Sequence, residues 1–357
     1  MEQNLLFRSM HKDPQDYRRF KECFDRNDSP RALDKVEWQY DTGFADELLV
    51  NVAVEPTPTD EEIAAIYAVF PVPFSLQGQA VKAAQSLDTM TDTRHQGKGL
   101  FKKLAQQVYT RCREGNYRLV YGFPNGNSAY AFFNRLGWKE VAEVPFMIAP
   151  LRTKYFLQRL PVLKHLAAVL PDIQWRGKKS VPSVYKEGIR PIERFDEQAE
   201  TLWKKFAANI PLAVTRNAQY LNWRFLQKPG EKYEMRGYWE KGVLTGYVIY
   251  VVKEKHGGRI GYLMELITDP AQPACGDALL RTALNDMVAQ KADACLAWNF
   301  AHSPNNALHK QNGFYPMPPK LRPIELHFGV LAMQAEDEPL LAEEKNWYLS
   351  YCDSDTV

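Results

Sequence analysis

Hydrophobic and polar positions follow a strand-then-helix pattern near the end of the first quarter of the chain. Residues 80–88 (AVKAAQSLD) read as a strand, and residues 100–113 read as an amphipathic helix. The apolar stripe of this helix is formed by Leu100, Leu104, Val108 and Cys112. The pattern therefore predicts a strand, a connecting turn and a helix in direct succession.

The turn between that strand and that helix is rich in glycine. Residues 90–104 read MTDTRHQGKGLFKKL, in which Gly97 and Gly99 permit backbone dihedrals that other residues avoid. The unpaired N–H groups and the positive end of the following helix favour an anion. Two glycines also make an ordinary tight turn, so the motif by itself only suggests a diphosphate site.

A second strand and helix follow. Residues 117–123 (YRLVYGF) predict a strand, and a short helix ends at Gly137, before Trp138. Asn127 or Ser128 is the expected N-cap of this helix, because short polar side chains accept hydrogen bonds from the first turn.

Together, the glycine turn, the second strand and the helix ending in Gly137-Trp138 resemble the GNAT superfamily of acetyl-CoA-dependent N-acetyltransferases. In that family the first loop reads Gln/Arg-x-x-Gly-x-Gly/Ala. The sequence from Gln96 matches it except that Phe101 stands in the last small position, and a register from Arg94 fits as well.

The resemblance implies acetyl-CoA as the cofactor. Backbone groups around Met90, Thr91 and Thr93 would bond the pantetheine arm and polarise the thioester carbonyl. The loop that would hold the diphosphate consists of Gln96, Gly97, Lys98, Gly99 and Leu100. On the second helix, Ser128 and Phe133 are expected to contact the cofactor.

The residue at the position of the general acid departs from the family pattern. Phe133 occupies the position of a tyrosine that often protonates the leaving thiolate. Tyr121 and Tyr130 are the substitutes that we consider. An ordinary thiol has a pKa of roughly 8.5, so water could also supply the proton.

Asp88 is the best-placed candidate for the general base, because it stands at the end of the strand that leads into the loop. A solvated strand end or a turn cap is the competing interpretation. His95 lies inside the loop, where exposure or a cofactor contact is expected rather than base catalysis. Lys98, Lys102 and Lys103 could meet phosphates or be solvated helix charges.

Similar landmarks recur in the second half of the chain. Trp38-Gln39-Tyr40 and Trp223-Arg224-Phe225 each precede strand patterns, and residues 305–314 repeat a helix that ends in Gly-aromatic. Between them, residues 270–276 contain two prolines and no Gly-x-Gly. The sequence predicts an α+β protein with two tandem GNAT-like domains, each a mixed, mostly antiparallel twisted sheet flanked by helices. Chance similarity between α+β domains is the alternative.

We expect four segments. These are an acetyl-CoA-binding domain at 1–150, a basic linker at 151–185, a degenerate GNAT-like domain at 186–333 and an acidic tail at 334–357. Residues 151–171 form a basic amphipathic pattern, which suits a linker helix better than a membrane surface. The aromatic residues Trp347, Tyr348 and Tyr351 suggest that the tail folds back onto the chain.

Composition narrows the function classes. The chain has 357 residues, a formal net charge of +2 and five scattered cysteines. These features give no reason to expect nucleic acid or a metal site, and they fit reduced thiols in the cytoplasm. The chain shows neither a secretion signal nor about 18 consecutive apolar residues, so no stable membrane insertion is expected.

Three functions remain open from the sequence. The first is N-acetylation of a small-molecule amine, such as an amino sugar, because double-domain GNAT proteins are often associated with bacterial polysaccharide pathways. The second is aminoacyl transfer of the peptidoglycan-bridge type, whose tandem-fold enzymes do not bind coenzyme A. The third is non-catalytic acyl-CoA binding, which Phe133 favours. Peptide amines remain possible acceptors, and the oligomeric state is not predicted.

Overall fold

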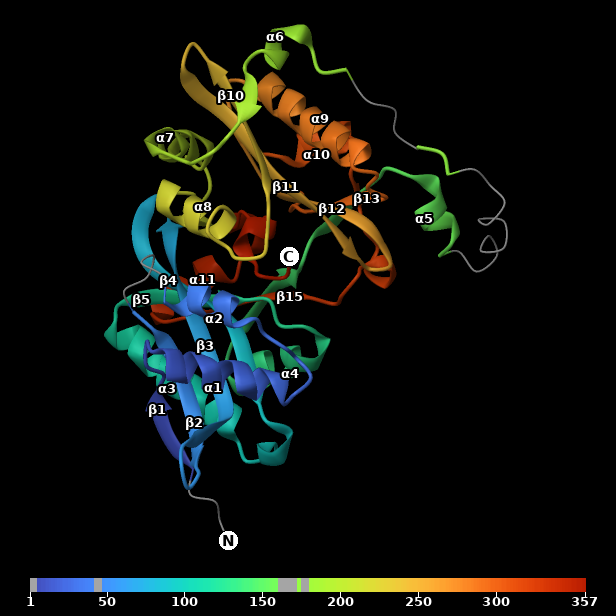
Figure 1. Cartoon of the computed structure of the whole chain (residues 1–357). Helices are drawn as coiled ribbons and strands as arrows, with labels where there is room; N and C mark the ends of the chain where they lie inside the picture. The colour runs from blue at the N-terminus through green and yellow to red at the C-terminus, as the bar shows by residue number, and fades with distance from the viewer. Residues whose placement is uncertain (1–4, 42–46, 160–171, 175–179) are drawn as a thin grey trace. The chain divides into compact units, whose positions relative to one another are not determined.

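The computed structural model describes residues 5–41, 47–159, 172–174 and 180–357 (Figure 1). Residues 160–171, which belong to the predicted linker helix, lie outside the described part. Contacts divide the chain into two units. The first unit contains Met1–Glu143, Gln227–Glu231 and Leu326–Asn346, and the second contains Val144–Leu226, Lys232–Glu325 and Trp347–Val357.

The first unit is built on a mixed sheet. In spatial order its strands are β1 (Leu6–Ser9), β2 (Leu49–Pro56), β3 (Glu61–Leu76), β4 (Gln79–Thr91), β5 (Tyr117–Gly122), β15 (His327–Ala332) and β6 (Lys139–Glu143). β4 and β5 run parallel, and the other neighbouring pairs run antiparallel.

Helices cover both faces of this sheet. They are α1 (Pro14–Asp25), α2 (Leu33–Tyr40), α3 (Leu100–Glu114), α4 (Gly126–Arg135) and α11 (Glu338–Leu341), with short 3₁₀ turns at Thr93–His95, Ala335–Asp337 and Glu344–Asn346. Alternate residues of the strands face opposite layers. Val50 and Val52 join the core of α1 and α2, whereas Ala53 joins the core of α3 and α4. α1 and α2 therefore cover one face, and α3 and α4 cover the other.

The second unit repeats this sheet. In spatial order its strands are β8 (Ile189–Pro191), β10 (Glu234–Glu240), β11 (Val243–Lys255), β12 (Gly258–Thr268), β13 (Ala294–Trp298), β7 (Phe146–Pro150) and β14 (Tyr315–Pro316). β12 and β13 are its parallel pair, at the position that β4 and β5 hold in the first unit. The prediction of two domains, each a mixed sheet flanked by helices, is confirmed.

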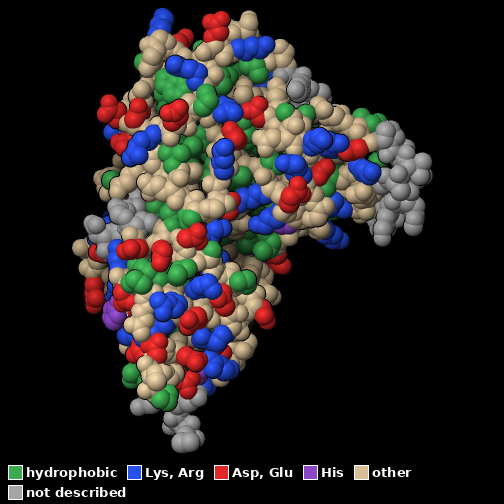
Figure 2. Space-filling view, in the orientation of Figure 1, with side chains coloured by type: hydrophobic (Ala, Val, Ile, Leu, Met, Phe, Trp, Pro, Cys, Tyr) green, Lys and Arg blue, Asp and Glu red, His purple; other side chains and the backbone are tan. Residues whose placement is uncertain are grey.

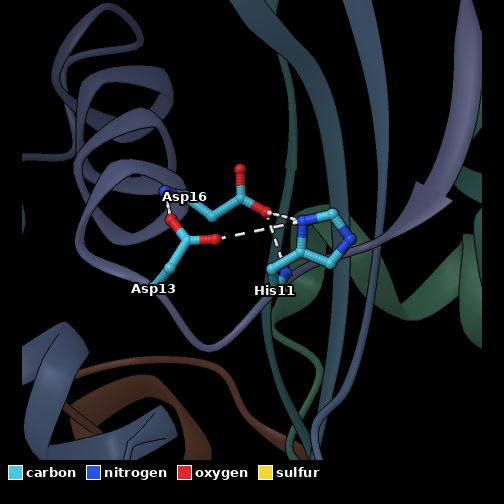
Figure 3. A group of neighbouring side chains, drawn as sticks. All are labelled: His11, Asp13 and Asp16. Carbon is cyan, nitrogen blue, oxygen red and sulfur yellow. Dashed lines mark hydrogen bonds and ion pairs between the residues drawn. The ribbon is translucent and has the colours of Figure 1, made fainter.

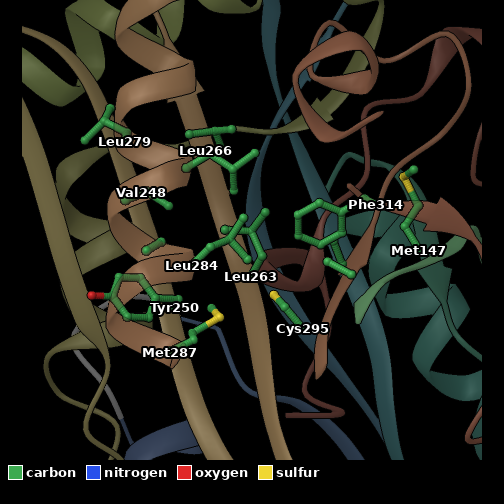
Figure 4. Close-up of a cluster of buried hydrophobic side chains, with 14 of the residues drawn as sticks. Met147, Val248, Tyr250, Leu263, Leu266, Leu279, Leu284, Met287, Cys295 and Phe314 are labelled. Atoms are coloured by element: carbon green, nitrogen blue, oxygen red, sulfur yellow. The ribbon is translucent and has the colours of Figure 1, made fainter. Parts of the chain in front are cut away.

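The remaining elements of the second unit are mostly helices. They are α5 (Thr153–Leu157), α6 (Ser183–Lys186), α7 (Glu197–Phe206), β9 (Leu212–Val214), α8 (Ala218–Phe225), α9 (Pro273–Ala289), α10 (Asn306–Gln311), and 3₁₀ turns at Pro319–Leu321 and Tyr351–Asp353. α9 packs its apolar face on the sheet, where Leu279, Leu284 and Met287 meet Val248 and Leu263 (Figure 4).

Each half of the sequence gives one strand to the sheet of the other half. β15 lies between β5 and β6 in the first unit, and β7 lies between β13 and β14 in the second. The expected continuous domains at 1–150 and 186–333 therefore differ from the observed units. Strand pairing between such distant segments leaves no local trace in the sequence, which explains the difference.

The segment expected as an acidic tail is ordered and packed. Trp347, Tyr348 and Tyr351 are buried, as predicted for anchors that fold back. Residues 334–346 belong to the first unit, where Asp337 pairs with Arg118, and residues 347–357 belong to the second.

Candidate functional site

The glycine loop forms the entrance to α3. Gly97 and Gly99 have φ angles of +78° and +71°, which side-chain-bearing residues rarely adopt. Gly99 is the N-cap of α3, and no side chain caps this helix. The first backbone N–H groups of α3 are therefore available to an anion.

Beside this loop, the two parallel strands separate. β4 pairs with β5 from Lys82 to Ser86, but β5 ends at Gly122 while β4 continues to Thr91. Beyond Ser86, this edge of β4 is no longer hydrogen-bonded to β5. Its backbone N–H and C=O groups can bond an extended ligand there.

A bulge in β4 lies at the same place. Tyr67 pairs with Thr89 and Val69 pairs with Ser86, so two residues of β4, Leu87 and Asp88, oppose a single residue of β3. Bulges of this kind bend a strand and redirect its side chains, and they are frequent next to active sites.

A cavity of about 290 Å³ occupies the gap. It is lined by Phe24, Ser29, Arg31, Ser86, Leu87, Asp88, Thr89, Met90, Gly122, Phe123, Pro124, Asn125, Ser128 and Phe132. Phe24 belongs to the core of α1 and α2, and Phe132 to the core of α3 and α4. The cavity therefore reaches both faces of the sheet.

Asp88 is the carboxylate of this lining. Its oxygens accept hydrogen bonds from Arg31 Nη2 at 2.6 Å, Tyr40 Oη at 2.9 Å and Gln39 Nε2 at 3.1 Å. The side chain is 7% exposed, and that of Arg31 is 43% exposed. Asp88 is thus held firmly at the cavity wall, which excludes the solvated strand end considered above.

Several predicted cofactor residues lie around this cavity. Met90 and Ser128 line it together with Asp88. Thr91 continues β4 beyond it, and the Thr93 N–H donates to Asn27 Oδ1 at 3.0 Å. In the loop, Gln96, Gly97, Lys98 and Gly99 are exposed, and Leu100 is buried at the start of α3.

The predicted acid candidates lie elsewhere. Tyr121 is buried against Phe123 and Phe328, and Tyr130 is 62% exposed. Neither belongs to the described lining of the cavity. Phe133 packs against Gly329, where an added Cβ would lie 2.7 Å from its ring.

His95 is buried rather than exposed, so that part of the expectation was wrong. Its Nε2 lies 3.2 Å from Glu55 Oε2, and its Nδ1 lies 3.1 Å from Lys98 Nζ. Lys103 stacks on Phe7 at 3.5 Å, and Lys102 is exposed.

The N-cap of α4 is Asn125, not Asn127 or Ser128. Its Oδ1 accepts from the N–H groups of Asn127 and Ser128, each at 3.1 Å. Sequence reasoning also missed Arg31 and Phe132 as cavity residues. The polar Asn125, directly after a strand, was the available signal for the cap.

The corresponding helix of the second unit begins differently. Pro273 starts α9 and has no N–H to offer. An added Cβ at Gly276 would lie 2.7 Å from Leu308 Cδ1, whereas Gly97 and Gly99 have nothing within 4 Å. The start of α9 is filled by side chains.

One group of possible metal ligands lies at the start of α1. Figure 3 shows His11, Asp13 and Asp16, whose ligand atoms lie within 4.8 Å of one another. Asp16 already accepts from Arg8 at 2.6 and 2.7 Å and from Arg19 at 2.9 Å. Burial opposes ionisation of Asp16, but hydrogen bonds from Arg8, the His11 N–H and Arg19 lower its pKa to about 2. We therefore interpret the group as a charged cap of α1.

The cysteines are buried, and none of the five forms a disulfide. Burial raises the pKa of Cys23, Cys112 and Cys275 to about 12. Thiol nucleophiles are therefore excluded at these three positions.

Charged side chains of both signs are interspersed over the face of the molecule in Figure 2. Among the described residues, no helix is both long and apolar enough to span a bilayer.

Comparison with known proteins gives a match to a family model over part of the chain and a likeness of fold. The family model of the GNAT acetyltransferase domain matches residues 12–141. The search of curated proteins gives no match.

Among solved structures, Saccharomyces cerevisiae N-myristoyltransferase with bound myristoyl-CoA has a TM-score of 0.61 and 14% identity, over 93% of this chain and 83% of its own. An Enterococcus faecalis V583 protein described as a probable N-acyltransferase has a TM-score of 0.63 and 13% identity, over 92% of this chain and 72% of its own. At these identities the likeness concerns the fold.

Proposed function

We propose that the protein transfers acetyl from acetyl-CoA to a primary amine, because residues 12–141 match the family model of the GNAT acetyltransferase domain. The family supports acyl transfer from a CoA thioester. The finer assignment is our proposal: a small-molecule acceptor, such as an amino sugar or polysaccharide precursor, in the cytoplasm of a bacterium.

The observation that carries this proposal is the cavity between β4 and β5, next to the uncapped start of α3. We assign the diphosphate to the loop from Gln96 to Leu100, and the pantetheine arm to the unpaired edge of β4 near Met90 and Thr91. Ser128 lines the same cavity and would contact the thioester end.

The reaction is direct aminolysis. The amine nitrogen attacks the thioester carbonyl, a C–N bond forms and the C–S bond breaks. An acceptor ammonium loses two protons, of which one ends on the CoA sulfur and the other in solvent. Backbone N–H groups near Thr91 would stabilise the oxyanion.

Asp88 is our candidate for binding and deprotonating the ammonium, because it is the carboxylate of the cavity lining. Tyr121 and Tyr130 are less suited to protonate the thiolate, since one is buried outside the lining and the other faces solvent. Water or Ser128 is the better candidate.

A second candidate function is non-catalytic acyl-CoA binding. It is favoured by the absence of a tyrosine from the described lining of the cavity. A longer acyl chain is a variant of the first function, because a structural neighbour is described with bound myristoyl-CoA.

Two measurements test the proposal. Thermal shifts with acetyl-CoA, myristoyl-CoA and free CoA report cofactor binding and acyl preference. Release of free thiol from acetyl-CoA, measured with a panel of amines, reports turnover. Stabilisation without thiol release by any amine would favour the non-catalytic function, and no stabilisation by any CoA species would exclude both.

A further inference from the structure

Arg31 has hydrogen-bonding groups that the described residues do not use. It lies between α1 and α2 and lines the cavity. Its Nη2 donates to Asp88 Oδ1 at 2.6 Å. Among the described residues, its Nε and Nη1 have no hydrogen-bond partner. Three N–H bonds are therefore open to a ligand.

The guanidinium is nevertheless held in place. Its carbon atom lies over the Phe24 ring, 4.9 Å from the ring centre, which is a cation–π contact. Asp88, its ion-pair partner, is anchored in turn by Tyr40 and Gln39. An arginine that is fixed in this way loses little conformational entropy when it binds a ligand.

Arg31 and Asp88 are the charged residues of the described cavity lining. Apart from Arg31 and Asp88, the polar side chains of the described lining are neutral, namely Ser29, Ser86, Thr89, Asn125 and Ser128. Arg31 and Asp88 thus present one positive and one negative group at 2.6 Å. A small molecule with an ammonium close to an acidic group is complementary to such a pair.

The cofactor does not account for Arg31. The phosphates of CoA are assigned to the start of α3, which packs on the opposite face of the sheet from α1 and α2. The face that carries Phe24 and Arg31 is left for the acceptor.

We infer that the acceptor amine carries an oxyanion, a carboxylate or a phosphate, which binds Arg31 while its ammonium lies at Asp88. This inference rests on the proposed function, because it names the acceptor class of the same site. A planar guanidinium binds both oxyanions through paired hydrogen bonds, so the chemistry is shared by amino acids and amino-sugar phosphates.

Matched acceptors test the inference. The members of each pair differ in one anionic group: an amino acid and its amide differ in the carboxylate, and an amino-sugar phosphate and the free sugar differ in the phosphate. We expect kcat/KM for a charged acceptor to exceed that for its neutral partner. Arg31→Gln should lower kcat/KM for charged acceptors by about tenfold to a hundredfold more than for their neutral partners, because both kinds of acceptor depend on Asp88 but only the charged ones bind Arg31.

Two further variants are matched controls. Arg31→Lys keeps the charge without the paired geometry and should retain part of the preference. Arg18→Gln removes the same charge from an exposed position on α1 outside the cavity lining and should behave as wild type. The KM for acetyl-CoA should stay unchanged in all three variants.

The outcomes separate this inference from the proposed function. If the amino-acid pair shows the preference the anion is a carboxylate, and if the sugar pair shows it the anion is a phosphate. Equal turnover of charged and neutral acceptors, or an equal loss for both in Arg31→Gln, would overturn the inference and leave acetyl transfer intact. Absence of thiol release with every amine would overturn both.

Discussion

The two units share a strand order and one parallel pair, but they treat the bulge beside that pair differently. In the first unit, the bulge at Leu87 and Asp88 opens onto the cavity. In the second, the ladder of β11 and β12 is interrupted at Met264, next to Glu265. Glu265 is buried and hydrogen-bonds Arg216, Tyr348 and Ser350.

The acid–arginine pairs of the two units differ in how far their side chains are exposed to solvent. Arg31 and Asp88 have exposed side-chain fractions of 43% and 7%, whereas those of Arg216 and Glu265 are both 0%. Residues 347–357 supply the further partners in the second unit, including Asp353, which also pairs with Arg216. In the first unit part of the Arg31 side chain stays exposed, whereas in the second unit the chain itself surrounds both members of the pair.

Arg216→Met should have the largest effect on this comparison. It leaves Glu265 and Asp353 buried without their cation, which should cost about 3–5 kcal/mol of unfolding free energy. Urea denaturation measures this loss. Arg31→Met is the matched control and should cost less than about 1 kcal/mol, because Arg31 is 43% exposed and Tyr40 and Gln39 still donate hydrogen bonds to Asp88. Equal losses in the two variants would remove the contrast.

The second effect is pH dependence at His309, which corresponds in sequence to Phe133. Burial lowers the pKa of His309 to about 4, against an ordinary value of 6.5. The folded state thus favours the neutral ring, so its contribution is complete above pH 6.5 and is lost as the pH falls towards 4. The loss should reach about 3 kcal/mol.

Unfolding free energies between pH 4 and 8 check this prediction. His309→Phe, which copies the first unit, should flatten the profile over that window. A profile that is just as steep in the variant would assign the pH dependence to other groups.

Gly99→Asp should weaken acetyl-CoA binding by roughly a hundredfold, because it places a negative charge where the diphosphate is assigned. Aspartate tolerates a positive φ better than most residues, and the added Cβ meets nothing within 4 Å. Calorimetric titration gives the Kd, and the melting temperature should change little.

Gly276→Ala in α9 tests the second unit in the way that Gly99→Asp tests the first. Its Cβ would contact Leu308 and Thr268, so we expect a loss of about 1–3 kcal/mol in stability with an unchanged Kd. If Gly276→Ala weakened acetyl-CoA binding in a protein that stays folded, the cofactor would not be confined to the first unit.

Phe133→Tyr should have the smallest effect. The ring packs on Gly329 and lies outside the cavity lining. We therefore expect kcat to change by less than about tenfold, not the gain of about 10²-fold or more that a positioned acid provides. Steady-state kinetics with the best acceptor measure this. A large gain would show that the hydroxyl can reach the sulfur.

Local features of the fold were predictable from the sequence, and distant ones were not. The helix expected at 100–113 is observed at Leu100–Glu114, because its apolar stripe and the preceding glycine are local signals. The same holds for the helix ends at Gly137 and Gly313, whose φ angles are +76° and +81°. Arg31 could not be identified, since its role depends on a strand 57 residues away in sequence.

The strand β15, which the second half of the sequence gives to the first sheet, also sets when that sheet can be completed during synthesis. The first sheet lacks the strand between β5 and β6 until residues 327–332 have been made. At about 5–20 residues per second, that strand follows β6 by roughly 10–40 s. For that interval the nascent amino-terminal half exposes the edges of β5 and β6, and a chaperone that shields bare strand edges should bind the growing chain then.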